Sequence, residues 1–208
     1  MGYGFLDIAA TPSVHAAQEA NGSGEYWTNF KGDRAFDHFT EAEIAFIVER
    51  DSFYMATVSE SGWPYVQHRG GPPGFIRVLD DRTLGLADFR GNRQYISIGN
   101  LAADDRAALI LMDYPNRRRL KIYAHVETRD LTSDPGLSAK LILPEYRAKV
   151  ERGLIIHLAA FDWNCLQHIT PRFSAEELAP VLAPLRERLE ALESENQALR
   201  AKLTAKGD

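Results

Sequence analysis

Residues 53–69 read FYMATVSESGWPYVQHR, and this stretch decides the fold class. Aromatic and β-branched residues fill its two ends, and the turn-forming residues Ser59 to Gly62 separate them. Pro64 fits this pattern because a proline is tolerated where a strand begins. The stretch therefore predicts a β-hairpin of two antiparallel strands, at 53–58 and 65–69.

The same pattern repeats further along the chain. We expect a second strand pair at 74–79 and 84–89, a third at 107–114 and 120–131, and a last strand at 154–163. Seven short strands broken by Gly and Asp turns are typical of an antiparallel barrel or sandwich.

Helices are expected around these strands. Thr40 and Glu43 have the spacing of a capping box, which predicts a helix at 41–50. Two further helices are expected at about 92–102 and near 135–150.

The chain is expected to have three parts. Residues 1–39 lack a steady hydrophobic period and are expected to form an irregular arm, the main domain spans 40–173, and a helix occupies 174–208. The length of 208 residues and the 45% hydrophobic content suit one main domain.

Charge and cysteine content narrow the classes of partner. The net charge of −5 gives no reason to expect nucleic acid or an acidic membrane surface as partner. No signal-peptide pattern or long apolar stretch is present, so a cytoplasmic protein without a membrane partner is expected. The single cysteine, Cys165, cannot form an internal disulfide and is interpreted as a small buried hydrophobe rather than a catalytic thiol.

The C-terminal helix carries a heptad pattern. One heptad position holds Leu182, Leu189, Asn196 and Leu203, and the other holds Leu178, Leu185, Leu192 and Leu199. Such a seam predicts a parallel dimeric coiled coil, which the lone asparagine keeps in register. The alternative is an amphipathic helix packed on its own barrel. Pro180 and Pro184 suggest that the uninterrupted coil begins near Pro184.

In a parallel coil the charges beside the seam are complementary. Arg188 would face Glu193 of the second chain, and Glu195 would face Arg200. An antiparallel pair would lose this scheme.

Basic residues gather in three segments. In 87–94, Asn92 is interpreted as a helix N-cap and Arg93 as a phosphate ligand, the alternative being an ordinary helix start with a solvated arginine. In 65–74, strand alternation places Gln67 and Arg69 on one face and His68 on the other. The run at 116–121 is either a third part of the site or solvated surface.

These motifs, in this order, resemble the pyridoxamine 5'-phosphate oxidase-like superfamily of FMN-binding split barrels over roughly residues 40–165. The resemblance is carried by Met55-Ala56-Thr57-Val58, Gly62-Trp63-Pro64-Tyr65, Ala87-Asp88, Asn92-Arg93-Gln94 and Arg118-Arg119-Leu120-Lys121-Ile122. It implies an α+β protein with a six- to seven-stranded antiparallel split barrel and peripheral helices. It also implies a homodimer with FMN bound at the subunit interface.

The resemblance also implies which residues contact the cofactor. The family's flavin and phosphate stretch corresponds to Gln67, His68 and Arg69, and its Tyr-Thr pair corresponds to Ala87 and Asp88. Its Ser-Arg-Lys helix start corresponds to Asn92, Arg93 and Gln94. Its hairpin glutamine from the second subunit corresponds to Arg119, and its C-terminal tryptophan corresponds to Trp163.

Two departures from the family pattern bear on function. The Arg-x-His substrate motif of the true vitamin B6 oxidases is replaced by residues 167–173, so oxidation of that vitamin is not expected. Gln94 replaces a lysine at the helix start, a loss that Arg69, Arg90 or Arg93 would compensate.

The expected function is therefore FMN-dependent oxidoreduction of an unidentified small molecule, with oxygen or NAD(P)H as redox partner and no catalytic residue assigned. A non-enzymatic flavin carrier or sensor, and a haem- or deazaflavin-binding barrel, are the alternatives. His125 and His157 lack metal ligands at suitable spacing, so no metal site is expected.

Overall fold

The computed structural model describes residues 4–28, 37–163 and 167–204. Cys165 lies outside the described residues. The helices are α1 (Phe5–Ala9), α2 (Pro12–Ala20), α3 (Gly24–Thr28), α4 (Glu41–Val48), α5 (Ile96–Ala103), α6 (Pro135–Leu141) and α7 (Ala175–Thr204). The strands are β1 (Ser52–Val58), β2 (Pro64–Gly70), β3 (Arg77–Asp80), β4 (Thr83–Phe89), β5 (Arg106–Asp113), β6 (Arg118–Arg129) and β7 (Val150–Trp163).

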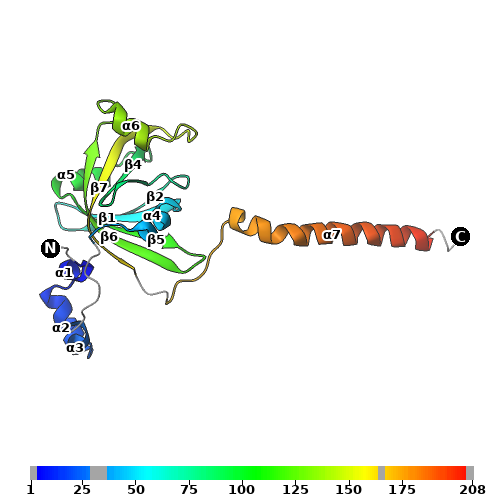
Figure 1. Cartoon of the computed structure of the whole chain (residues 1–208), viewed down its shortest axis with the longest axis horizontal. Coiled ribbons are helices and arrows are strands. Elements are labelled where there is room, and N and C mark those ends of the chain that lie inside the picture. Colours follow the sequence, from blue (N-terminus) through cyan, green and yellow to red (C-terminus); the bar gives the residue numbers. More distant parts are fainter. Residues whose placement is uncertain (1–3, 29–36, 164–166, 205–208) are drawn as a thin grey trace. The chain divides into compact units, whose positions relative to one another are not determined.

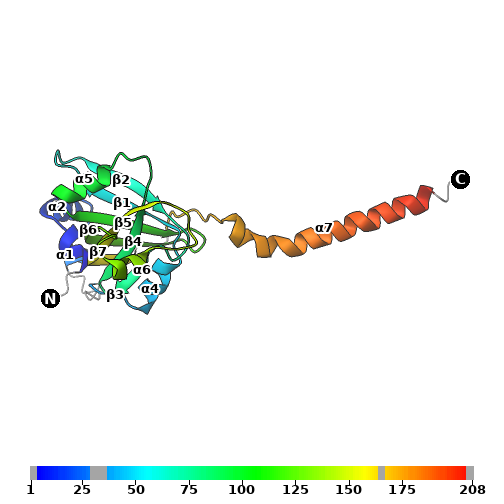
Figure 2. The same cartoon turned by 90° about the horizontal axis from the view of Figure 1, so that it is seen from above.

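All of these strands belong to one antiparallel sheet in the order β2-β1-β5-β6-β7-β4-β3, which curls into a split barrel (Figures 1 and 2). The expected strand pairs are present, although β3 begins later and β7 earlier than predicted. The predicted α+β split-barrel fold is therefore confirmed. In this order β2 stands at one edge of the sheet and is not a ladder neighbour of β4.

The core of the barrel follows from strand alternation. In β1, Phe53, Met55 and Thr57 are buried, and the residues between them are not. The largest fully buried apolar side chains of the barrel are Phe53, Met55, Phe75, Ile76, Leu84, Leu86, Leu111, Leu120, Ile122 and Phe161. Leu131, Leu141 and Ile155 form a smaller second cluster.

Helix α4 begins at the predicted capping box. The Thr40 N–H donates to Glu43 Oε2 at 2.9 Å, and the Ala42 N–H donates to Thr40 Oγ1 at 3.3 Å. Glu43 also accepts a hydrogen bond from Trp163 Nε1 at 2.6 Å, which ties α4 to β7. Burial alone would raise the pKa of Glu43, but the hydrogen bonds from Thr40 and Trp163 outweigh burial and lower it.

The prediction of an irregular N-terminal arm was wrong for the described residues. They form α1, α2 and α3, and Pro12 occupies the first turn of α2, where its missing N–H costs nothing. No residue of α1 or α2 is buried, so these helices lack the apolar stripe that would have revealed them.

Two helix boundaries also differ from the prediction. Helix α5 begins at Ile96 instead of about residue 92, and Tyr95, not Asn92, is its N-cap. The Asn92 side chain accepts a hydrogen bond from the Gln94 N–H at 3.1 Å and so forms a turn before the helix. Helix α6 ends at Leu141 because Pro144 disfavours helical geometry at the residue before it.

The predicted long C-terminal helix is confirmed as α7, which is continuous through Pro180 and Pro184. No described side chain of α7 is buried. Together with residues 114–116, α7 belongs to a compact unit separate from the unit that contains the strands. Across the described ranges, no helix combines the length and the apolar character needed to cross a membrane.

Candidate functional site

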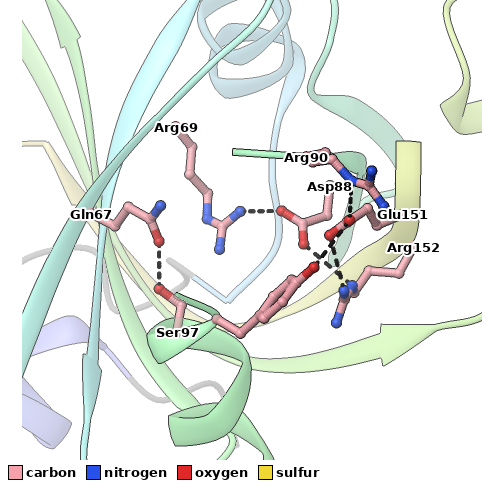
Figure 3. A network of polar contacts seen from close by, with 8 residues as sticks. Gln67, Arg69, Asp88, Arg90, Ser97, Glu151 and Arg152 are labelled. Carbon is pink, nitrogen blue, oxygen red and sulfur yellow. Dashed lines mark hydrogen bonds and ion pairs between the residues drawn. The ribbon is translucent and has the colours of Figure 1, made fainter. Parts of the chain in front are cut away.

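A pocket of about 240 Å³ lies where the barrel is split, with β2 on one side and β4, β7 and the start of α5 on the other (Figure 3). Its walls are residues 67–70, Phe75, residues 86–93, Tyr95, Ser97, Ile98 and Glu151.

Strand alternation along β2 aims two polar side chains at this pocket. Gln67 and Arg69 are half-buried, whereas His68 is exposed and makes an edge-to-face contact with Tyr54 at 5.4 Å between ring centroids. This confirms the predicted separation of Gln67 and Arg69 from His68, although His68 also borders the pocket.

Side chains of β2 contact both β4 and α5 beside the pocket. Arg69 Nη1 lies 2.5 Å from Asp88 Oδ1, and only 10% of each side chain is exposed. The Ser97 hydroxyl donates to Gln67 Oε1 at 2.9 Å (Figure 3). Because β2 and β4 share no ladder, side chains rather than backbone hydrogen bonds link the barrel at this point.

Glu151 organises the far side of the pocket. Its Oε1 lies 2.7 Å from Arg90 Nε and accepts the Tyr95 hydroxyl at 3.1 Å, and its Oε2 lies 3.2 Å from Arg152 Nη2 (Figure 3). The Arg90 hydrogen bond lowers the pKa of Glu151, and Glu151 in turn raises the pKa of Arg90. Arg152 Nε also lies 3.5 Å from Asp88 Oδ2, which connects this group to Arg69.

The pocket carries more positive than negative charge. Its walls and immediate neighbours provide Arg69, Arg90, Arg93 and Arg152, against the carboxylates of Asp88 and Glu151. Within the described chain, Arg93 has no ion-pair partner, and the buried Nε atoms of Arg69 and Arg152 have no hydrogen-bond partner. The pocket thus has donors and charge to spare for an anion.

The backbone at the pocket is in an uncommon conformation. Arg93 and Tyr95 have φ of 63° and 54°, in the left-handed region that costs a non-glycine residue about 1–3 kcal/mol. Helix α5 follows directly, and no side chain caps its first N–H groups. Strained backbone, an uncapped helix start and Arg93 thus lie together at one wall.

The family profile of pyridoxamine 5'-phosphate oxidase matches residues 39–152, more than half of the 208-residue chain. The chain belongs to the pyridoxamine 5'-phosphate oxidase family. This confirms the resemblance recognised in the sequence, and the matched residues include β1 to β6 and every residue that lines the pocket.

Three solved structures are similar to this member of the pyridoxamine 5'-phosphate oxidase family over more than half of the chain. A putative pyridoxamine 5'-phosphate oxidase from Lactobacillus delbrueckii is 20% identical, with a TM-score of 0.46 over 61% of this chain and 94% of that one. An FMN-binding protein from Syntrophomonas wolfei is 13% identical, with a TM-score of 0.43 over 71% of this chain and 97% of that one. An F420 reductase is 22% identical, with a TM-score of 0.38 over 56% of this chain and 93% of that one. No curated protein matches the chain.

Most of the residues that the pyridoxamine 5'-phosphate oxidase resemblance implied lie together. The pocket is bordered by Gln67, His68, Arg69, Ala87, Asp88, Asn92 and Arg93. Gln94 is not among its lining residues, although both of its neighbours are.

Arg119 and Trp163 lie outside this pocket. Arg119 is half-buried on β6 opposite Met112 of β5. Trp163 contacts α4 through its bond to Glu43 and an edge-to-face contact with Phe46, whose ring centroid is 4.7 Å away. The other basic residues at 116–121 also lie outside the pocket, and Lys121 pairs with Asp162 at 2.8 Å.

Sequence reasoning missed four residues of the site: Tyr95, Ser97, Glu151 and Arg152. Tyr95 falls within the helix expected at about 92–102, which in fact starts after it. Glu151 and Arg152 reach the pocket because Arg152 pairs with Asp88 in the β4–β7 ladder, a register that no local pattern reveals. In the described ranges, no group of three or more His, Cys, Asp or Glu is placed to hold a metal ion.

Proposed function

We propose that the protein is an FMN-binding oxidoreductase of a small molecule, with the FMN phosphate held at the wall formed by Arg93 and the start of α5. The observation that carries this proposal is the excess of arginine over carboxylate in a pocket at the split of the barrel. Guanidinium groups and uncapped helix N–H groups are the donors that a phosphate dianion requires.

The pocket fits such a group because its internal pairs leave donors unused. The buried Nε atoms of Arg69 and Arg152 lack hydrogen-bond partners, and Arg93 lacks an ion-pair partner, in the chain as described. Arg93 would hold the phosphate, while Gln67, Arg69 and Ala87 would line the ring. A cation there, Arg69 of the same chain or Arg119 of a second one, would favour the anionic reduced form of a flavin.

A second copy of the chain would complete the site. The pocket volume of about 240 Å³ lies below the roughly 300–1,000 Å³ usual for ligand pockets, which supports a site shared between two subunits. The outer face of β1 and β2 exposes Tyr54, Val58 and Val66, apolar surface suited to a homodimer. Arg119 lies outside the pocket of its own chain, as a residue donated to the second subunit would.

Bound FMN supplies the transfer of two electrons between the small molecule and oxygen or NAD(P)H. The residues of this chain bind the phosphate, orient the ring and set the charge around it. We also propose that the protein is located in the cytoplasm.

A second candidate is a flavin carrier or sensor without turnover. It is favoured by the state of Asp88 and Glu151, the two pocket carboxylates, which are both engaged by arginines and so are poorly placed to transfer protons. Oxidation of NAD(P)H by the loaded protein separates the two candidates. The absorption spectrum of the purified protein distinguishes FMN from a deazaflavin or haem.

The deciding experiment compares FMN with riboflavin. FMN should bind more tightly, and Arg93→Ala should raise its dissociation constant about 10- to 100-fold, because a hydrogen bond to a charged group contributes about 1.5–3 kcal/mol. Arg129→Ala is the matched control, since Arg129 lies outside the pocket and pairs with Glu127 on the surface. Equal affinity for FMN and riboflavin would refute the phosphate assignment.

A further inference from the structure

Helix α7 presents an apolar face that no described residue of its own unit covers. The seam leucines Leu178, Leu182, Leu185, Leu189, Leu192 and Leu199 are between 36% and 65% exposed. Leaving this much apolar surface in water is costly, at roughly 25 cal/mol for each Å². A stripe of leucines along a helix of 30 residues indicates a surface that is buried in the assembled protein.

The two prolines do not interrupt this face. Helix α7 is continuous through Pro180 and Pro184. With the leucines at heptad positions a and d, Pro180 falls at position f and Pro184 at position c, both on the outer side of the helix. The seam therefore extends from Leu178 to at least Leu199.

We propose that α7 pairs with α7 of a second copy of this chain as a parallel, in-register coiled coil. The charges beside the seam match when the partner is identical: Arg188 faces Glu193, and Glu195 faces Arg200. This pairing goes beyond the proposed function and does not depend on it.

Asn196 identifies the direction of the two helices. It occupies an a position in an otherwise leucine seam, where its amide meets a hydrogen-bonding partner only if the second helix places its own Asn196 at the same level. An antiparallel pair would set Asn196 against leucine and bring g positions beside g. A different protein could pair in this way only if it had an asparagine at the same a position. It would also need charges at its e and g positions that are complementary to those of α7.

The test uses the full chain in a Cys165→Ser background. Leu199→Cys places a thiol in the seam, and Ser194→Cys places a matched thiol at the outer position f of the same helix. Under mild oxidation of dilute purified protein, Leu199→Cys should form a disulfide-linked dimer at least about tenfold faster than Ser194→Cys. Circular dichroism of the reduced variants checks that both keep the helix.

Mixed samples test the direction. Leu199→Cys mixed with tagged Leu182→Cys should form the 199–199 and 182–182 dimers and little of the 199–182 product. Predominance of the 199–182 product would overturn the parallel arrangement. Equal rates for Leu199→Cys and Ser194→Cys, or no dimer from purified protein, would overturn pairing with a second copy.

Discussion

The barrel and helix α7 use leucine in opposite ways. Leu111, Leu120 and Leu154 of the barrel are 0% exposed, whereas Leu185 and Leu189 of α7 are 65% and 57% exposed. A single copy of the chain therefore buries the core of the barrel, whereas the seam leucines of α7 stay exposed, as the proposed pairing with a second copy requires. The difference shows that the same residue type stabilises the fold of one part of the chain and leaves an apolar surface exposed in another, which is the surface we propose as an interface.

The largest expected effect is a core truncation in the barrel. Leu111→Ala should lower the free energy of unfolding by about 2–5 kcal/mol, because it removes a fully buried side chain and leaves a cavity. Leu185→Ala is the matched change on α7 and should leave the barrel's unfolding transition in place. Urea denaturation followed by Trp fluorescence measures both, and similar losses in the two variants would break the comparison.

Glu43 sharpens the comparison, because a buried carboxylate fixes α4 to the barrel. Glu43→Ala should cost about 1.5–3 kcal/mol at neutral pH, since it removes the partner of Thr40 and of Trp163. Glu41→Ala, in the same first turn, is the control.

The pH dependence of this effect has a definite sign. The folded pKa of Glu43 is lowered, so its contribution is fully present above its ordinary value of 4.5 and is lost as the pH falls through the folded pKa. The difference in stability between wild type and Glu43→Ala should therefore shrink below pH 4.5. A constant difference down to pH 3 would contradict this assignment.

A change at Asn196 tests whether the α7 seam is buried between two copies. Asn196→Leu should stabilise the coil by up to about 1.5–3 kcal/mol for each buried leucine and should relax the preference for dimers. Gln197→Leu, one position outside the seam, should do neither. Light scattering coupled to size exclusion reports the oligomer, and an unchanged melting temperature and mass for Asn196→Leu would place Asn196 outside an interface.

The smallest expected effect is that of removing α7. Deletion of residues 174–208 should leave a dimer whose dissociation constant for FMN changes less than twofold, because the pocket is built entirely from the unit that contains the strands. Titration of FMN into the shortened protein measures this. A monomer that still binds FMN would contradict the shared site, and loss of binding would mean that α7 contributes to it.

The sequence predicted those features whose determinants are local. The capping box of α4 needs only Thr40 and Glu43, three residues apart, and the β1–β2 hairpin needs one turn between two strands. The start of α5 was misplaced because Asn92 satisfies a local turn as well as it would cap a helix. Glu151 and Arg152 were missed because the β4–β7 register brings them to Asp88 from a distant part of the chain.

The contact between Arg69 and Asp88 joins two strands that share no backbone ladder. Separating β2 from β4 at this point breaks the ion pair but no backbone hydrogen bond. We therefore expect the mouth of the pocket to widen more readily than the strand ladders open. We expect the rates at which a ligand enters and leaves the pocket to follow the lifetime of the Arg69–Asp88 pair.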